Sequence, residues 1–341
     1  MMNATDGRPP AHHGPDGRFR NPPGSPRSAA TGRDMWRFFG QMWREGSHVE
    51  NPLGHALDPV AVGAAVRAAP NPSITWLGHA AFLIRSAGKV VLTDPFLGDV
   101  AGPRLLGRHF GPRRHVPPAI AATELPPIDL LLLSHNHYDH LDVPTLKVLA
   151  RNPQTEVVVP LGLARMMRKL GFARVHELDW WQERTFDNLA VHLLPAVHFS
   201  GRGPFDRKKT LWGSFGLHAD DARIWFSGDS ATGDVFREIG ETAGPFDLGL
   251  VGIGAYEPRH IMQASHATPE EAVGMLRAVR AARGVGMHWG TIKLTTEHPF
   301  EAPHRFKAAA REQSYGEDNA IVLKIGETLP LKERPIALAA E

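Results

Sequence analysis

Four side chains that can bind a metal ion lie within six positions of one another in the stretch IDLLLLSHNHYDHL, residues 128–141. Imidazole nitrogen and carboxylate oxygen are good ligands for zinc and its neighbours. A single histidine is usually a core or surface residue, but three histidines and an aspartate at this spacing indicate a metal site. The pattern His-x-His-x-Asp-His offers two pairs of ligands for two adjacent ions: His135 with His137, and Asp139 with His140.

The apolar run before these residues indicates how they are positioned. Residues 130–133 are four leucines followed at once by polar residues, which is typical of a short strand buried on both faces. A loop that leaves the end of such a strand can hold side chains at a fixed point. Three further candidates also follow expected strands: His198 after 191–194, Asp229 after 223–226 and His288 after 285–287.

Length and composition restrict the class of protein. The 341 residues allow one large domain or two small ones, and the absence of cysteine excludes disulfides and Cys-ligated zinc. The net charge is +2, and the positive balance lies in residues 1–45, which argues against a body that binds nucleic acid. There is neither a signal-peptide pattern nor an apolar run of membrane-spanning length. We therefore expect a cytoplasmic protein, with peripheral contact to the inner membrane face as an option.

The ligand pattern is that of the metallo-β-lactamase superfamily. Within it, residues from about 16 to about 326 resemble the N-acyl-phosphatidylethanolamine-hydrolysing phospholipase D branch. Two strings are the most specific to this branch: GPFDLGLVGIGAYEPR at 244–259 and ELDWWQE at 177–183. Other matching strings are TWLGHA (75–80), TDPF (93–96), VPLGL (159–163), LWGSFGL (211–217), FSGDS (226–230), HATPEEAV (266–273) and MHWGT (287–291).

The resemblance implies an α/β fold, the αββα sandwich, in which two mixed β-sheets pack face to face with helices outside. It implies two divalent ions at one edge, with zinc expected first and iron or manganese as alternatives. Asp229 would bridge the two ions, and Asp94 would accept a hydrogen bond from a metal-bound histidine. The implied ligands of metal 1 are His135, His137, His198 and Asp229, and those of metal 2 are Asp139, His140, Asp229 and His288.

The reaction implied by the resemblance is release of an N-acylethanolamine from an N-acyl-phosphatidylethanolamine-like lipid, with phosphatidic acid as the other product. A metal-bridging hydroxide would attack the phosphodiester. Asp139 and Asp229 would act through the metals, His266 and Tyr256 would contact the substrate, and His79 would lie near the site. Two alternatives remain open: a lactonase of the ascorbate-phosphate lactonase type, and a superfamily nuclease. The relatives include dimers, so a homodimer is a further expectation.

Four segments are expected along the chain. Residues 1–33 are rich in Pro, Gly and Arg and are expected to be an unordered tail, although DGRFRNP at 16–22 resembles an arm that lies on the body. A helix capped by Asp34 should cover 34–46, and its aromatic side chains suit either a lipid surface or packing on the body. The segments are a tail (1–33), a helix with its connection (34–72), a catalytic domain (73–326) and a C-terminal tail (327–341).

Two groups of residues near the expected site have open roles. A basic loop at 100–118 would either bind a phosphate or face solvent; its arginines are Arg104, Arg108, Arg113 and Arg114. Trp180 and Trp181 are expected to support the site structurally. Further strands are expected at 73–77, 81–86, 89–93, 157–159, 175–178, 211–217, 247–251 and 321–324, and helices at 144–149, 161–170, 269–283 and 300–311.

Overall fold

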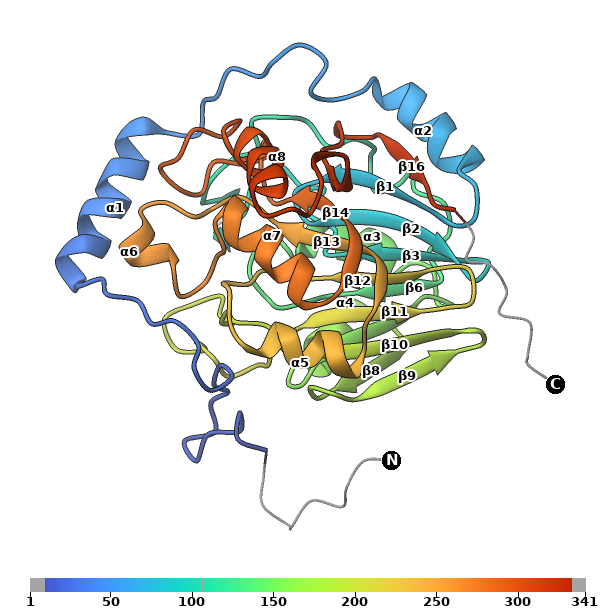
Figure 1. Cartoon of the computed structure of the whole chain (residues 1–341), viewed down its shortest axis with the longest axis horizontal. Helices are drawn as coiled ribbons and strands as arrows, with labels where there is room; N and C mark the ends of the chain where they lie inside the picture. The colour runs from blue at the N-terminus through green and yellow to red at the C-terminus, as the bar shows by residue number, and fades with distance from the viewer. Residues whose placement is uncertain (1–9, 106, 333–341) are drawn as a thin grey trace.

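Two seven-stranded β-sheets form the centre of the molecule in the computed structural model, which describes residues 10–105 and 107–332 (Figure 1). The first sheet has the order β16-β1-β2-β3-β6-β7-β8 and the second has the order β15-β14-β13-β12-β11-β10-β9. Each is antiparallel in one half and parallel in the other. The expectation of two mixed sheets in an α/β fold is confirmed.

The first sheet carries the metal-binding loop on β6 (Leu130–Leu132), whose three leucines are fully buried. The parallel neighbours of β6 are β3 and β7, so apolar residues face helices and core on both sides. The other strands of this sheet are β1 (Ser73–Gly78), β2 (Ala81–Ser86), β3 (Lys89–Thr93), β7 (Glu156–Pro160), β8 (Arg174–Leu178) and β16 (Thr328–Pro330).

The second sheet carries the other candidate ligands. Its strands are β9 (Glu183–Phe186), β10 (Leu189–Leu194), β11 (Ser214–His218), β12 (Arg223–Phe226), β13 (Phe246–Gly252), β14 (Ala281–Met287) and β15 (Ala320–Ile321). A separate two-stranded hairpin, β4 (Arg104–Leu105) with β5 (Arg108–His109), lies in the basic loop. One continuous cluster of buried apolar side chains includes members of both sheets, such as Trp76, Phe82, Phe215 and Trp225.

The helices lie outside the sheets, and α5, α7 and α8 cover the outer face of the second sheet in Figure 1. Helix α7 begins as its sequence predicts, with Thr268 and Glu271 forming a capping box. The helices are α1 (Gly32–Glu45), α2 (Pro59–Ala68), α3 (Val143–Leu149), α4 (Ala164–Leu170), α5 (Val235–Thr242), α6 (Arg259–Met262), α7 (Pro269–Ala278) and α8 (Ala302–Glu312), and a 3₁₀ turn covers Glu317–Asn319. None of the described helices is long and apolar enough to cross a membrane.

Several predicted helix boundaries are wrong, and two of them have a clear physical reason. The helix expected at 269–283 ends at Ala278, because residues 281–283 pair with β13 and begin strand β14. Pairing within the sheet overrides the local helix propensity of the Ala- and Arg-rich segment. Helix α1 begins at Gly32, and Thr31 is its N-cap. Asp34, expected as the cap, is the third helical residue and its carboxylate closes the capping box onto Thr31.

Both terminal segments attach to the body within the described residues. From Pro10 onward the segment expected to be an unordered tail packs on the body of the molecule, with the Phe19 N–H donating to the Lys208 carbonyl at 2.8 Å. We call residues 10–28 the arm. At the other end, β16 pairs antiparallel with β1, so the tail expected from residue 327 adds an edge strand instead. Residues 1–9 and 333–341 lie outside the described residues.

Candidate metal centre

The candidate ligands follow strands whose C-terminal ends meet at one edge of the sandwich. His198 follows β10, Asp229 follows β12 and His288 directly follows β14. Strands β12 and β14 run in the same direction through β13, and β10 runs with them through β11. Ligand sites in open α/β sheets lie at such carboxyl ends. The loop after β6 reaches the same edge from the facing sheet with His135, His137, Asp139 and His140.

The first group of ligand atoms is the one implied for metal 1. It comprises His135, His137, His198 and Asp229. Nδ1 of His137 lies 2.9 Å from Nε2 of His135 and 3.2 Å from Nε2 of His198. Oδ2 of Asp229 lies 3.8 Å from Nε2 of His135 and 3.7 Å from Nε2 of His198. Four donors from three separate segments therefore converge on one point.

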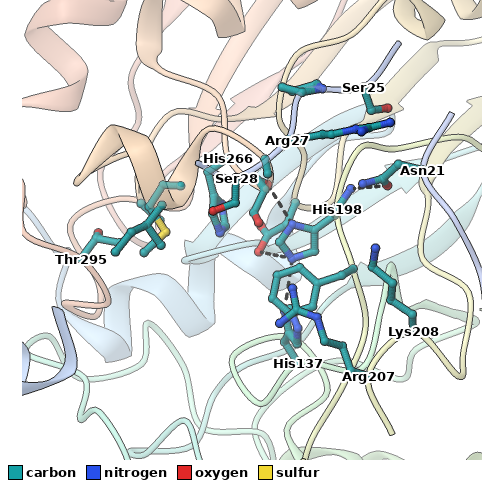
Figure 2. Close-up of a pocket in the computed structure, with 18 of the residues that line it drawn as sticks. Asn21, Ser25, Arg27, Ser28, His137, His198, Arg207, Lys208, His266 and Thr295 are labelled. Atoms are coloured by element: carbon teal, nitrogen blue, oxygen red, sulfur yellow. Dashed lines mark hydrogen bonds and ion pairs between the residues drawn. The ribbon is translucent and has the colours of Figure 1, made fainter. Parts of the chain in front are cut away.

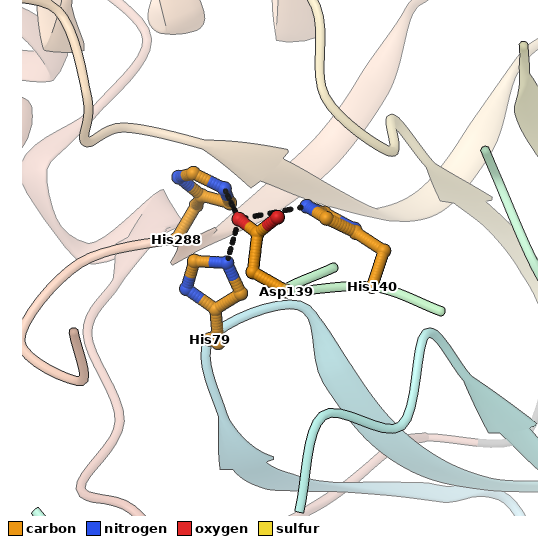
Figure 3. A group of neighbouring side chains, drawn as sticks. All are labelled: His79, Asp139, His140 and His288. Atoms are coloured by element: carbon orange, nitrogen blue, oxygen red, sulfur yellow. Dashed lines mark hydrogen bonds and ion pairs between the residues drawn. The ribbon is translucent and has the colours of Figure 1, made fainter. Parts of the chain in front are cut away.

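The second group contains Asp139, His140 and His288, as implied for metal 2, together with His79 (Figure 3). Oδ2 of Asp139 lies 3.6 Å from Nε2 of both His140 and His288. Asp229 reaches this group with both oxygens: Oδ2 is 3.0 Å from His140 Nε2 and Oδ1 is 3.1 Å from His288 Nε2. One carboxylate thus faces both groups, the position that a bridging ligand needs.

His79 was expected near the site and has a specific contact there. Its Nε2 lies 2.8 Å from Oδ2 of Asp139, and its ring centroid lies 3.9 Å from that of His288. Figure 3 shows Asp139 enclosed by the three imidazoles of this group. His79 therefore contacts two candidate ligands of metal 2, as an additional ligand or as a hydrogen-bonding partner of Asp139.

Buried polar atoms without partners support a cation in this place. Among the described residues, Nε2 of His140, both ring nitrogens of His288 and Oδ1 of Asp229 are buried and make no hydrogen bond. Buried polar atoms in native proteins are nearly always paired, and leaving one unpaired costs about 1–3 kcal/mol. All of these residues are in the two ligand groups, so a divalent ion would satisfy the atoms that the protein leaves open.

Outer hydrogen bonds orient the imidazoles so that Nε2 faces inward. Nδ1 of His140 donates to Oδ2 of Asp94 at 2.7 Å, as the resemblance implied. Ser134 donates its hydroxyl to Asp94 and accepts from Nδ1 of His135 at 2.8 Å. Nδ1 of His198 donates to the Ser265 carbonyl at 2.8 Å. Such partners fix the tautomer of a ligand and raise its basicity.

The backbone at the site is held in an uncommon conformation. His79, Asp94 and His288 have φ values of 53°, 32° and 64°, in the left-handed region that costs a residue with a side chain about 1–2 kcal/mol. Backbone strain of this kind persists where the surroundings fix it and is frequent at functional sites. Three instances around one cluster indicate that the fold is stabilised elsewhere to keep these side chains in place.

Burial and charge separate the histidines into two classes. Burial lowers the pKa of His137 to about 4 and the pKa of His135 and His198 well below the usual value, so these rings present neutral nitrogen. Burial also opposes the charged form of His140 and His288, but the Asp229 and Asp139 carboxylates raise both pKa values, to about 9 for His288. A bound cation would take the place of the protons on those two rings.

A cavity of about 770 Å³ opens onto the first ligand group. His137, Asp139, His198 and Asp229 form its floor, and His266 lies beside them with its ring 5.1 Å from that of His198. In Figure 2, Arg27 lies above His198, Lys208 and Arg207 lie to the right of it and below it, and His266 and Thr295 lie to its left. Apolar wall residues are Met35, Phe38, Phe39, Ile261, Met262 and Leu294.

Two predicted substrate contacts do not line this cavity. Tyr256 is fully buried beneath the Arg305 guanidinium, 4.7 Å from its ring centroid. The basic loop at 100–118 also lies elsewhere: Arg114 turns inward, where it donates to the Phe96 and Val116 carbonyls. Arg104 and Arg113 line a different, shallower groove. The cations of the metal cavity are instead Arg20, Arg27, Arg207 and Lys208.

Asn21 is a site residue that sequence reasoning missed. Its side-chain oxygen accepts from the backbone N–H of His198 at 3.0 Å and from Nε1 of Trp212 at 3.1 Å. The arm that carries Asn21 is fastened by His12 and His13, whose Nε2 atoms lie 2.6 and 2.7 Å from the two oxygens of Asp179. The only signal in the sequence was the arm-like string at 16–22.

Comparison with known proteins gives the family. Residues 89–289 match the model of the β-lactamase superfamily domain. The chain is 37% identical over 273 residues to N-acyl-phosphatidylethanolamine-hydrolyzing phospholipase D 1 of Caenorhabditis elegans, covering 76% of each protein. It is 31% identical over 261 residues to the mitochondrial N-acyl-phosphatidylethanolamine-hydrolyzing phospholipase D of Saccharomyces cerevisiae, covering 74% of this chain but 55% of the yeast protein.

Solved structures share the fold at lower identity. An isothiocyanate hydrolase from Delia radicum gut bacteria superposes with a TM-score of 0.60 at 18% identity, covering 76% of this chain and 99% of that one. The metallo-hydrolase Igni18 of Ignicoccus hospitalis gives 0.55 at 20% identity, with coverages of 76% and 99%. The chain belongs to the metallo-β-lactamase superfamily of metal-dependent hydrolases and resembles, within it, the N-acyl-phosphatidylethanolamine-hydrolysing phospholipases D.

Proposed function

We propose that the protein is a dinuclear metal-dependent phosphodiesterase that hydrolyses N-acyl-phosphatidylethanolamine-like phospholipids to an N-acylethanolamine and phosphatidic acid. The observation that carries the proposal is the cavity at the ligand groups, which combines metal-binding side chains with cationic and apolar walls. A phosphodiester head with acyl chains has the matching chemistry. The similarity to lipid-cleaving relatives supports the same choice.

The residues of the chain have distinct roles in this proposal. His135, His137 and His198 would hold one ion, Asp139, His140 and His288 the other, and Asp229 would contact both. Two divalent ions, zinc first and iron or manganese as alternatives, would supply a hydroxide at neutral pH and neutralise phosphoryl oxygen. Asp94, Ser134 and the Ser265 carbonyl keep the ligand rings oriented. His266, on the cavity wall, would donate a ring N–H to a substrate oxygen.

Helix α1 supports a lipid substrate, and we include membrane contact in the proposal. Its inner side contributes Met35 and Phe38 to the cavity wall. Its outer side exposes 78% of Trp36 and 84% of Trp43. Large exposed aromatics on one amphipathic helix suit the interfacial region of a bilayer. An acyl chain leaving the bilayer at α1 would enter the cavity along the side chains that line it.

A hydrolysis panel on metal-loaded protein tests the activity. The substrates are N-acyl-phosphatidylethanolamine in detergent micelles, bis-p-nitrophenyl phosphate, a γ-lactone and a short RNA, the last two representing the alternative activities. We expect the protein to cleave both N-acyl-phosphatidylethanolamine and bis-p-nitrophenyl phosphate, and to prefer the lipid. His137→Ala should lose nearly all of this activity, because it removes the imidazole nearest both His135 and His198. Turnover of the lactone or RNA alone would overturn the proposal.

Vesicle co-sedimentation tests the membrane contact separately. Trp36→Ala/Trp43→Ala removes the two most exposed aromatics of α1 and should reduce binding to vesicles of phosphatidylglycerol and phosphatidylcholine. Turnover of bis-p-nitrophenyl phosphate should stay unchanged, since neither tryptophan lines the cavity. Equal sedimentation of variant and wild type would remove α1 from the proposal.

A further inference from the structure

Four cationic side chains surround the metal cavity, and three of them have no carboxylate partner among the described residues. Arg27, Arg207 and Lys208 form no ion pair there. Arg20 lies 4.0 Å from Asp16, and both side chains are more than half exposed, so that pair is weak. The acids of the cavity lining are Asp139 and Asp229, and both face the ligand groups.

Lys208 is partly buried, which makes its lack of an ion pair informative, whereas the Arg207 and Arg27 side chains are exposed. Burial lowers the pKa of Lys208, and the neighbouring charges of Arg207 and Arg20 lower it further. Taking a charge out of water is costly unless an opposite charge compensates it. The Arg207 guanidinium instead lies 4.1 Å from the ring centroid of Phe199, a contact that fixes its direction without neutralising it.

The backbone that carries these cations is a built structure. The Phe19 N–H donates to the Lys208 carbonyl at 2.8 Å, the Arg18 guanidinium donates to the Arg207 carbonyl, and the Lys208 N–H donates to the Ser200 carbonyl at 2.8 Å. The arm and the loop at 200–209 therefore hold each other in place. In Figure 2 the side chain of Arg27 from the arm lies above His198, and those of Lys208 and Arg207 from the loop lie to the right of it and below it.

A charge count indicates why a single phosphodiester would leave this side unneutralised. Two divalent ions with the Asp139 and Asp229 carboxylates and one hydroxide would have a charge of about +1, which one phosphodiester would cancel. The charges of Arg27, Arg207 and Lys208 remain. The N-acyl-phosphatidylethanolamine headgroup has no further acid to offer them, because its nitrogen is an uncharged amide.

We propose that the arm and the loop at 200–209 form a second anion subsite, which selects phospholipids whose headgroup carries an acidic group in addition to the scissile phosphodiester. This inference rests on the proposed phosphodiesterase function and refines its substrate class. The acidic group binds Arg27, Lys208 and Arg207 while the phosphodiester lies over the ligand groups. The acyl chains lie along the apolar wall at Met35, Phe38 and Met262.

Kinetics on a pair of matched lipids tests the subsite. The probes are N-acyl-phosphatidylserine and N-acyl-phosphatidylethanolamine with the same acyl chains in nonionic micelles, which differ by one carboxylate. Wild type should show a KM for the serine lipid roughly tenfold or more below that for the ethanolamine lipid. Arg27→Gln/Lys208→Gln should raise the first KM roughly 10- to 100-fold and the second less than about threefold.

Arg104→Gln is the matched control, since Arg104 is exposed on the basic loop and lines a different groove. It should leave both KM values unchanged. Calorimetry with soluble N-acetyl-glycerophosphoserine and N-acetyl-glycerophosphoethanolamine separates the subsite from the activity, because it needs no turnover. Tighter binding of the serine compound, lost in Arg27→Gln/Lys208→Gln, supports the subsite. If wild type shows equal KM values for the two lipids and binds the two soluble compounds equally, the subsite proposal is wrong. If wild type hydrolyses neither lipid but still binds the serine compound more tightly, only the proposed reaction is wrong.

Discussion

The attachment of the arm through Asp179 gives a prediction that can be worked from the structure. Asp179 is buried and accepts from Nε2 of His12 at 2.6 Å and from Nε2 of His13 at 2.7 Å. The His12 ring also stacks on Trp180 at 4.4 Å. A hydrogen bond to a charged group contributes about 1.5–3 kcal/mol. Asp179→Ala removes both bonds but leaves the stacking and the Asn21 contacts, so we expect arm docking to weaken by about 3 kcal/mol.

That loss corresponds to a roughly 150-fold larger population of the released arm. Limited trypsin digestion measures it, because cleavage after Arg18 requires the arm to leave the body. The rate of that cut, followed by mass spectrometry, should rise by about this factor at low protease concentration. His12→Ala/His13→Ala removes the same two bonds and also the stacking of His12 on Trp180, so the increase should be at least as large. Amide exchange at His198 should also accelerate, since its N–H donates to Asn21.

A matched pair of the same chemistry serves as the control. Nε2 of His176 lies 2.6 Å from Oε2 of Glu156, between β8 and β7 and away from the arm. Glu156→Ala removes a histidine–carboxylate contact of the same length and should leave the cut after Arg18 unchanged. If Asp179→Ala is cleaved no faster than wild type, the histidine pair does not hold the arm and the reasoning is wrong.

Three further predictions concern the ligands, the backbone and the pH dependence. Asp94→Asn should weaken metal binding roughly 10- to 100-fold, measured by competition with a chromophoric chelator, because Asp94 orients His140. Gly228→Ala should lower the free energy of unfolding, measured by urea titration, by about 2 kcal/mol or more, because φ is +54° and the new Cβ would lie 2.7 Å from the Cβ of Ser134. Gly88→Ala is the control: φ there is +72° but the space is open, so the free energy of unfolding should fall by about 1–2 kcal/mol. Burial lowers the pKa of His115 from 6.5 in the unfolded chain to about 4 in the folded protein. Between these two values the unfolded chain binds one proton more than the folded protein does, so the free energy of unfolding falls as the pH drops from 6.5 to about 4. His115→Gln should flatten the difference between urea midpoints at pH 7.5 and pH 5.

The strands were predictable where the local pattern and the tertiary pairing agree. β2 and β3 have the predicted bounds, because the turn at Gly88 and the following Asp94 end the apolar runs on each side. The strand end that carries the metal motif was predictable for the same reason: residues 130–132 are buried on both faces and polar ligands follow. The segment at 281–283 failed this test, since its Ala-Ala-Arg sequence favours a helix while its partner Phe246–Leu248 makes it a strand.

The arm could not be predicted from composition, because its stability comes from residues far away in the sequence. His12 and His13 contact Asp179, and Asn21 contacts His198 and Trp212, all more than 160 positions distant. A segment rich in Pro, Gly and Arg buries little apolar area by itself and resembles a disordered one. Specific polar contacts to a rigid surface order it instead, and single-sequence patterns do not record such contacts.

The strands position the candidate metal ligands, and the connecting segments form the walls of the cavity. The candidate metal ligands lie in loops that follow the ends of β6, β10, β12 and β14, and that arrangement would suit any substrate that a metal-activated hydroxide can attack. The cavity walls come from segments outside the sheets: the arm, α1, α6 and the loop at 200–209. Substitutions at Arg27 or Lys208 should therefore alter substrate preference without changing metal content. Substitutions at Asp94 should lower metal content without altering substrate preference. A variant of the arm that lost metal as well would show that Asn21, through the His198 backbone, couples the two.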